Sequence, residues 1–391
     1  MDRVIWTSKQ LFEDGGDYFQ ISSKGLFAKG SYGSGQLCEL VPFVNPSDRF
    51  YIGRPDTFFI AWSHCGNFLA ALSGPDDIDK PSVVEVYDIR SRKQVFALGN
   101  VEVGSIQWSP DGKYLVGAGK EFLVLWECTW SSSEEDLWGA TKLCSLELAD
   151  LLHRDGKTRS KTGEHNAPDV LPGAQVYLGQ SIGVFSPDSQ HILLDINQFE
   201  GEDLDGRILV VSLESLEGWI MIDSKQIWSP GGLSWSADGG SVFYEARTSS
   251  ERRGQGNLTR TTVNPVTREI SSFSPRIPAG QVRCNPRFRF LAVSEAKCHS
   301  DGMTMYEYFY PYSQKVDEEG TIRRDRSIPM PPDLISASIS FLKESDFSLL
   351  LRHSVESRVN CLEFSSDGTH LWCLCEDGMA FRADLPYSWR K

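Results

Sequence analysis

The sequence lacks any long uninterrupted apolar run, and this absence limits the classes of protein to which it can belong. No stretch approaches the roughly 18 consecutive apolar residues that a membrane-spanning helix needs, although 40% of the residues are hydrophobic. The first residues, Met1 to Lys9, also lack the apolar segment of a secretory signal. We therefore expect a chain with no membrane partner and with enough apolar material for a sizeable core.

Cysteine and basic residues are also scarce. The nine cysteines are odd in number and mostly stand singly inside apolar segments, as Cys38 does between Leu37 and Glu39. This pattern indicates reduced, buried thiols rather than a disulfide framework, and it favours a cytoplasmic or nuclear protein. The 39 lysines and arginines are outnumbered by 53 aspartates and glutamates, which gives a net charge of −14. Because phosphate binding needs a concentrated basic face, no direct nucleic-acid partner is expected.

Motifs that would indicate catalysis, a cofactor or a metal are few and lack the context that each chemistry requires. There is no Gly-rich phosphate loop. Residues 179–183 fit the G-x-S-x-G pattern of a hydrolase nucleophile, but Pro187 and turn-forming neighbours follow where that motif needs a helix. Cys373 and Cys375 are spaced as C-x-C rather than as the C-x-x-C of zinc sites, and burial against a neighbouring unit explains them better. We therefore predict no catalytic residue, no cofactor and no metal site, and we lean against enzymatic activity without excluding it.

What the sequence does contain is a short corner that recurs seven times. In its clearest copy an apolar strand ends at Trp108, a Ser109-Pro110-Asp111-Gly112 turn follows, and a second apolar strand begins at Tyr114. Aligned on the Trp108 position, the other copies stand at Ile21, Trp62, Phe185, Trp235, Cys284 and Phe364. A corner repeated at intervals of tens of residues is typical of a β-propeller, a ring of four-stranded blades.

The spacing of the corners supports this fold. Four of the six intervals, at 41, 46, 50 and 49 residues, are near the roughly 40–45 residues of a four-stranded blade. Between the corners, apolar runs predict strands at the same place in four units, at 83–89, 122–127, 208–213 and 379–385. The 27 residues after Phe364 and the 21 up to Ile21 together make 48, one further blade length. We therefore predict one all-β domain over residues 1–391, a closed propeller in which strands from both termini complete one blade.

The two long intervals leave alternatives open. The 77 residues between Trp108 and Phe185 predict an insertion at about 130–178, in which Leu143 to Leu152 is the one segment with helical periodicity. The 80 residues between Cys284 and Phe364 could instead hold a whole degenerate blade, with strands at 339–341 and 347–351. Seven blades is the first prediction and eight the second.

The last corner carries a resemblance to a known family. His353 precedes a strand that ends in the corner at 364–368, Asp377 lies in the next turn, and the unit closes with Ala383 and Asp384. This order resembles a WD-repeat, which has Trp where this chain has Ala383; TolB-like propellers share the corner and are the second choice. The resemblance implies hydrogen bonds that link the His353 and Asp377 positions, in a network that Ala383 leaves incomplete, and structural roles for the repeat residues. Those residues are Trp62, Trp108, Asp111, Asp188, Trp235, Asp238, His353, Asp367 and Asp377.

The function that the resemblance implies is a non-catalytic scaffold or adaptor, which binds protein or peptide partners through its loops and central channel face. One alternative is a propeller enzyme or small-molecule-binding protein with its site at the channel mouth. Another is a chromatin- or RNA-associated subunit whose contacts run through other proteins. An aromatic run would place Tyr306, Tyr308 and Tyr310 on one face of a strand, and we predict that they and Trp138 bind a partner.

Overall fold

The computed structural model consists of β-strands with two short 3-10 helices, η1 (Pro46–Asp48) and η3 (Tyr387–Arg390), in the part of the chain that it describes. The described residues are 3–12, 18–30, 37–74, 82–119, 122–129, 139–147, 175–177, 185–200, 203–216, 218–224, 232–246, 256–263, 270–298, 314–316, 322–324 and 334–390. Within those ranges no helix is long and apolar enough to cross a membrane.

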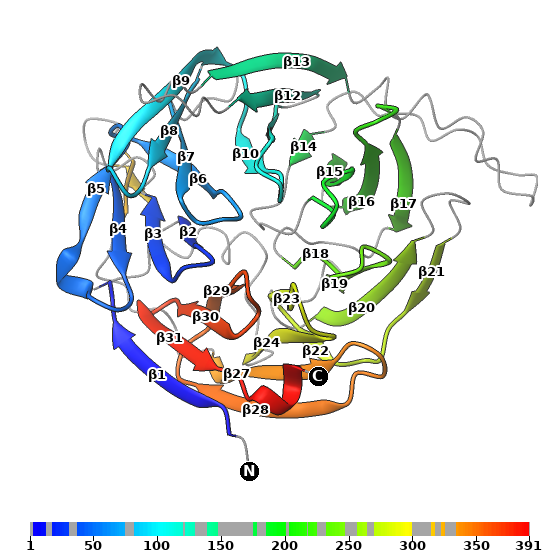
Figure 1. The fold of residues 1–391 in the computed structure, drawn as a ribbon. Helices are drawn as coiled ribbons and strands as arrows, with labels where there is room; N and C mark the ends of the chain where they lie inside the picture. The colour runs from blue at the N-terminus through cyan, green and yellow to red at the C-terminus, as the bar shows by residue number, and fades with distance from the viewer. Residues whose placement is uncertain are drawn as a thin grey trace, which may run out of the picture.

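Seven antiparallel sheets, each with a path of four strands, are arranged around a central axis (Figure 1). We number these blades from the first corner. Blade 1 contains β2 (Tyr18–Ile21), β3 (Leu26–Gly30), β4 (Cys38–Pro42) and β5 (Phe50–Ile52); blade 2 contains β6 (Thr57–Trp62), β7 (Phe68–Ser73), β8 (Ser82–Asp88) and β9 (Lys93–Val101). Blade 3 contains β10 (Ser105–Trp108), β11 (Tyr114–Ala118), β12 (Phe122–Thr129) and β13 (Gly139–Glu147); blade 4 contains β14 (Gln175–Tyr177), β15 (His191–Glu200), β16 (Asp203–Ser212) and β17 (Gly218–Ser224).

The remaining blades include two departures from the simple order. Blade 5 contains β18 (Ser234–Trp235), β19 (Ser241–Ala246), β20 (Gly256–Val263) and β21 (Ile270–Phe273), with the short β22 (Pro278–Ala279) also paired to β20. Blade 6 contains β23 (Val282–Cys284), β24 (Phe290–Cys298), β27 (Leu334–Lys343) and β28 (Leu349–Val355), and a separate hairpin of β25 (Gln314–Val316) and β26 (Ile322–Arg324) lies between β24 and β27 in sequence. Blade 7 contains β29 (Val359–Phe364), β30 (His370–Cys375), β31 (Met379–Asp384) and β1 (Ile5–Gln10).

Both ends of the chain contribute to blade 7, as the residue count predicts. The N-terminal strand β1 pairs antiparallel with β31, with Ile5 opposite Asp384 and Gln10 opposite Met379. The other predicted strands also occupy equivalent places, because β8, β12, β16 and β31 are each the third strand of a blade. The repeat in sequence is therefore a repeat in structure.

The long intervals are resolved in favour of seven blades. The expected strands at 339–341 and 347–351 belong to β27 and β28, the third and fourth strands of blade 6, and the described residues contain no eighth four-stranded sheet. The predicted insertion at 130–178 is narrower than expected, because β13 completes blade 3 and β14 begins the strands of blade 4. The helical interpretation of Leu143 to Leu152 is wrong over 143–147, where pairing with β12 makes an extended strand.

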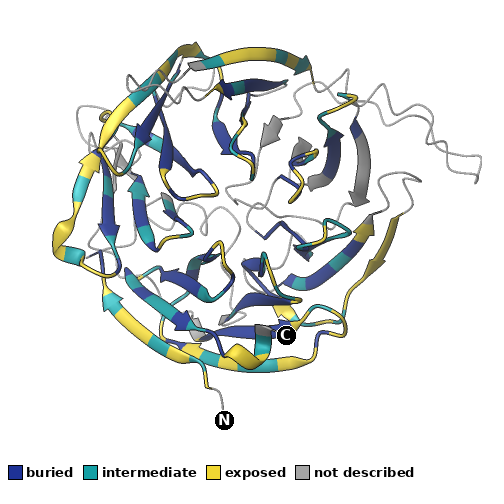
Figure 2. Cartoon of the chain, viewed as in Figure 1, coloured by how far each residue is buried: buried dark blue, intermediate teal, exposed yellow. Residues whose placement is uncertain are grey.

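The core lies between the blades. Seven hydrophobic clusters each combine buried residues of two adjacent blades, and one of them packs Phe27 of blade 1 against Trp372 of blade 7. Figure 2 shows burial concentrated in the inner strands and exposure in the outer ones. Apolar side chains on both faces of the inner strands explain this pattern, since each sheet is covered on two sides.

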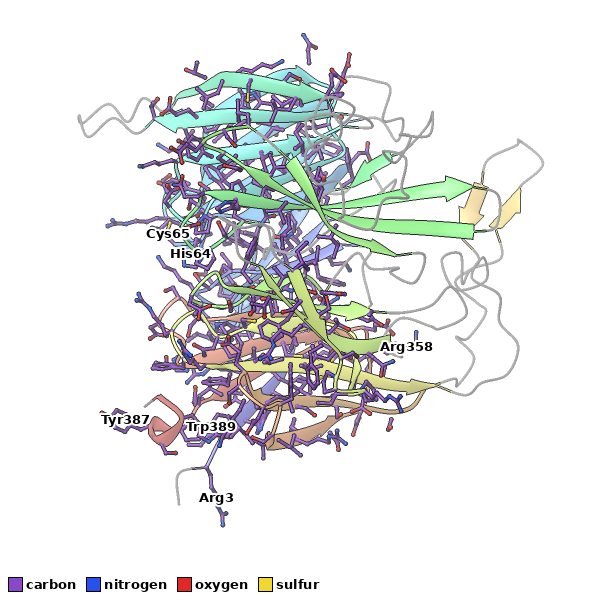
Figure 3. All side chains as sticks on the ribbon, turned by 90° about the vertical axis from the view of Figure 1, so that its right-hand side faces the viewer. Arg3, His64, Cys65, Arg358, Tyr387 and Trp389 are labelled. Atoms are coloured by element: carbon purple, nitrogen blue, oxygen red, sulfur yellow. The ribbon has the colours of Figure 1, made fainter. Side chains whose placement is uncertain are left out.

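The antiparallel order of the strands defines two faces of the ring. The seven corners join first to second strands, and the connections from third to fourth strands lie on the same side, which we call the corner face. The other connections, from second to third strands and from one blade to the next, lie on the opposite face. In Figure 3, His64 and Cys65 of the blade 2 corner lie on one side, whereas Arg358, between β28 and β29, lies on the other.

Candidate interaction face

Each corner is held by hydrogen bonds among residues five positions apart or fewer. In blade 3, Ser109 Oγ donates to Asp111 Oδ1 over 2.6 Å and accepts the Tyr114 N–H over 2.9 Å. The same Asp111 oxygen accepts the Lys113 N–H over 3.0 Å. Gly112 has a φ of +73°, a conformation that glycine adopts without a steric penalty. The turn is therefore specified by local sequence, which is why it can be recognised without a structure.

Three other corners repeat the serine–aspartate arrangement, in the pairs Ser186–Asp188, Ser236–Asp238 and Ser365–Asp367. These bonds favour the ionised carboxylate. For Asp367, desolvation acts to raise the pKa, but hydrogen bonds from Ser365 and Thr369 outweigh it and lower the pKa to about 2. The corner hydroxyls and carboxylates are thus engaged in building the turn.

Neighbouring corners are also bonded to one another around the ring. The bonds that cross between blades include Ser23 Oγ to the His64 carbonyl (2.8 Å), the Asp111 N–H to Ser189 Oγ (3.2 Å) and Asn285 Nδ2 to the Gly368 carbonyl (2.9 Å). Arg289 of blade 6 also lies 3.5 Å from the Asp238 carboxylate of blade 5. These contacts fix the corners of blades 1 and 2, of blades 3 and 4, and of blades 5, 6 and 7 relative to one another.

The third residue of each corner is exposed, and its charge differs around the ring. Blades 3, 4, 5 and 7 have aspartate there. Blade 1 has Lys24, blade 2 has Cys65 preceded by His64, and blade 6 has Arg287. The corner face therefore combines a common internal construction with side chains that vary from blade to blade.

The residue that precedes the Trp108 position is polar and buried in several blades. Gln20, Gln107, Ser234 and Arg283 occupy this place in blades 1, 3, 5 and 6, and the less buried Glu363 does so in blade 7. Arg283 Nε lies 3.5 Å from Glu363 Oε2. Burial raises the pKa of Glu363 to about 7, although the nearby charge of Arg283 acts in the opposite direction. At Gln107, which is 1% exposed, neither end of the amide has a partner among the described residues.

A second polar network, in blade 2, joins the connection between blades 1 and 2 to strand β8. Glu85 on β8 is buried, and its two carboxylate oxygens accept hydrogen bonds of 2.9 Å from Arg54 Nε and from the Tyr87 hydroxyl. Burial, followed by the hydrogen bond to Glu85, raises the pKa of Tyr87. The sequence analysis missed this network; the available signal was a carboxylate inside the otherwise apolar run 83–87.

Most of the predicted structural residues lie where the repeat places them. Trp62, Trp108 and Trp235 are buried at the ends of first strands, and each packs against the preceding blade. Asp111, Asp188, Asp238 and Asp367 stand in the corner turns. The recurring residues of the sequence therefore pack the blades together and form the corner turns.

The structure does not bring His353 and Asp377 together. His353 lies on the outer strand β28, where its ring stacks on Trp6 of β1 at a centroid distance of 3.9 Å, and burial lowers its pKa. Asp377 accepts the Met379 N–H in the β30–β31 turn. No hydrogen bond joins the two among the described residues, so the link implied by the WD-repeat resemblance is corrected. The N-terminal strand supplies the partner of His353 instead, which the sequence of one repeat could not indicate.

The predicted partner-binding residues, Tyr306, Tyr308, Tyr310 and Trp138, lie outside the described residues. The strand ends that flank them lie on different faces. Trp138 directly precedes β13, which starts at the corner face, whereas the tyrosines fall between β24 and β27, whose connected ends lie on the opposite face. Residues 179–183, with the G-x-S-x-G pattern, also lie outside the described residues.

The thiols Cys373 and Cys375 are buried in the cluster between blades 6 and 7, as predicted. Desolvation raises the pKa of Cys373. In the described part of the chain, no group of three or more His, Cys, Asp or Glu side chains could hold a metal ion.

Two solved structures are similar to the chain over almost all of its length. One is the β-propeller domain of Cps50 (Swd1) from Myceliophteria thermophila, with a TM-score of 0.54 and 11% identity over 97% of this chain and 100% of that one. The other is a chain of the mitotic checkpoint complex, also with a TM-score of 0.54 and 11% identity, over 98% of this chain and 95% of that one. No family model matches the chain, and no curated protein matches its sequence. The structural similarity shows the fold, and the β-propeller predicted from the repeated corners is confirmed.

Proposed function

We propose that this chain is a non-catalytic scaffold, which binds protein or peptide partners through exposed side chains on the faces of its ring. The observation that carries the proposal is that the buried residues of the corners form similar hydrogen bonds, whereas their exposed residues differ. Their buried serines are used within the turn, while the exposed third residues change in charge from blade to blade. A rigid surface with a distinct pattern of side chains suits recognition of another protein.

The similarity to a chain of the mitotic checkpoint complex supports this proposal, because that propeller is found in an assembly of proteins. The chemistry of the corners also supports it. The corner hydroxyls and carboxylates bond within their turns, and the Asn285 amide bonds to the blade 7 corner, so these groups serve the architecture.

The test is affinity purification of the tagged chain from its native cell, followed by mass spectrometry of the proteins that co-purify. Three variants locate the binding face. In one, a short Gly-Ser linker replaces residues 148–174, which leaves β13 and β14 intact. The second combines Tyr306→Ala, Tyr308→Ala and Tyr310→Ala, and the third is Trp138→Ala.

We expect a stoichiometric partner that survives moderate salt and is lost from at least one variant with an unchanged unfolding temperature. Replacement of residues 247–255, between β19 and β20 on the opposite face, is the matched loop control. If no partner rises above background with the intact chain, the scaffold proposal fails and a screen for channel ligands follows.

A further inference from the structure

We propose that the corner face binds an acidic segment of a partner protein at a basic site formed by Lys24, His64 and Arg287. These residues belong to the corners of blades 1, 2 and 6, and all three are exposed. The inference rests on the proposed scaffold function and adds the chemistry of the partner. The basic site contrasts with the net charge of the whole chain, which is −14.

The first step of the argument is that these blades break the local rule of the corner. In blades 3, 4, 5 and 7 an aspartate at the third position accepts the corner serine's hydroxyl and a backbone N–H. Lys24 and Arg287 replace that aspartate with a cation, which cannot accept either bond. Departures from a locally stabilising pattern are expected at functional sites, where they serve something other than stability.

The second step is that the replaced positions have donors available for a ligand. Arg287 uses Nε to donate to the Ser366 carbonyl over 3.3 Å, while its terminal nitrogens have no hydrogen-bond partner within the described residues. The His64 ring likewise has no side-chain hydrogen bond there. Guanidinium and imidazole donors left exposed in this way suit carboxylates, which take charge-assisted bonds.

The third step is that the three residues lie in one arc of the corner face. Their corners belong to blades 6, 1 and 2, and only the corner of blade 7 lies between those of blades 6 and 1. The Lys24 corner is bonded to that of blade 2 through Ser23, and Lys24 Nζ donates to Asn67 Oδ1. Desolvation by the surrounding corners and then the positive charge of Arg287 lower the pKa of His64, although the residue is exposed. A bound anion offsets the repulsion between such positive groups.

Of the four acidic third residues, one belongs to the same arc. Asp367 lies in the blade 7 corner, between those of blades 6 and 1, and its Oδ1 is occupied by Ser365 and Thr369. The remaining acidic corners, in blades 3, 4 and 5, lie on the other side of the ring, and Asp238 there is paired with Arg289. The cations at the third corner position are therefore all on one side of the ring.

The experiment uses the full-length protein and a fluorescein-labelled decaglutamate peptide, with binding followed by fluorescence polarisation at about 50 mM salt, where exposed charges are weakly screened. We expect saturable binding that the double variant Lys24→Glu and Arg287→Glu weakens roughly tenfold or more. The matched control is Lys113→Glu, which reverses an exposed lysine at the blade 3 corner and should change the affinity by less than about twofold. The milder pair Lys24→Gln and Arg287→Gln serves if charge reversal unfolds the protein.

Absence of saturable binding, or an equal loss with Lys113→Glu, overturns the inference. The scaffold function is tested separately by affinity purification of the Lys24→Glu and Arg287→Glu variant. If peptide binding fails but the cellular partner is still captured by this variant, the scaffold stands and the basic site does not bind the partner. Loss of both peptide and partner only from this variant supports the proposal in full.

Discussion

The ion pair between Arg283 and Glu363 allows a prediction worked out in numbers. Their side chains are 9% and 16% exposed, and Arg283 Nε lies 3.5 Å from Glu363 Oε2. Burial raises the pKa of Glu363 from 4.5 to about 7, in spite of the opposing effect of Arg283. The folded protein therefore holds this proton more tightly than the unfolded chain. Glu363 contributes less stability as the pH rises from about 4.5 to about 7, by about 3 kcal/mol in total.

The perturbation is Arg283→Met, which removes the charge that favours ionised Glu363. In the wild type, ionisation beside Arg283 gains about 1 kcal/mol at pH 8 and about 3 kcal/mol at pH 9. In the variant the pKa of Glu363 is higher, because Arg283 no longer favours the carboxylate, so some or all of this gain is lost. At pH 6 Glu363 is protonated in both proteins, so only the packing and the Arg283 Nη1 hydrogen bond to the Val282 carbonyl are lost. That loss is the same at every pH.

The assay is urea unfolding of both proteins at pH 6, 8 and 9, followed by tryptophan fluorescence. The variant should be destabilised more at pH 8 than at pH 6, by up to about 1 kcal/mol, and more again at pH 9, by up to about 3 kcal/mol. Arg352→Met is the control. It breaks the exposed Arg352–Glu295 pair, 3.2 Å apart, and should cost less than about 1 kcal/mol at each pH because water solvates the remaining carboxylate. Equal destabilisation by Arg283→Met at all three pH values would refute the assigned coupling.

Three further predictions concern the corners. Gly25→Ala should destabilise by about 3 kcal/mol in urea unfolding, because φ is +73° and the new methyl would lie 2.6 Å from the Trp372 ring. Gly112→Ala, with the same φ and nothing within 4 Å, should cost only about 1 kcal/mol, and equal costs would contradict the clash. Asp367→Asn should lower the free energy of unfolding by about 1 kcal/mol at pH 7, after allowance for solvent screening. The lowered pKa of Asp367 means that its carboxylate stabilises the fold above pH 3.8, so the difference from the wild type should vanish on acidification towards pH 2. Trp108→Phe should cost less than about 2 kcal/mol by thermal unfolding, because the buried indole N–H has no partner among the described residues, whereas Trp108→Ala should cost about 4 kcal/mol.

The corners could be predicted from the sequence because their stabilising contacts are local. Ser109, Asp111 and Tyr114 bond within five residues, so the pattern that folds the turn is also the pattern that can be read. The shared blade could be predicted because it follows from counting residues at both ends. The third strands followed from their apolar runs.

The candidate site could not be predicted in the same way, because its contacts join distant segments. Asn285 and Gly368 are 83 residues apart, and Arg283 and Glu363 are 80 apart. Each pair becomes adjacent only when blades 6 and 7 are packed side by side. The interval of 80 residues left an eighth blade open for a related reason: strands β27 and β28 look alike whether they complete one blade or begin another.

The same physics explains why the fold is recognisable while the sequence matches no family model. In a propeller blade, polar contacts join the strands to the connections between them, and different residues can make these contacts. Blade 2 uses Arg54, Glu85 and Tyr87, each bonded over 2.9 Å. In blade 7, where Ala383 replaces the tryptophan of a WD-repeat, Asp384 accepts two hydrogen bonds from Arg382 and lies 2.9 Å from His370 Nδ1.

Because different residues can make such contacts, the motif positions differ from blade to blade while the architecture repeats. The corner varies less, and six of the seven blades have its serine. Asn285 replaces the serine in blade 6 and still accepts the backbone N–H groups of Arg287 and Phe288. At the exposed third position, Lys24 and Arg287 replace an aspartate that stabilises the turn in four other blades. Because these two cations give up that local stabilisation, they are the residues at which recognition of a particular partner should be tested first.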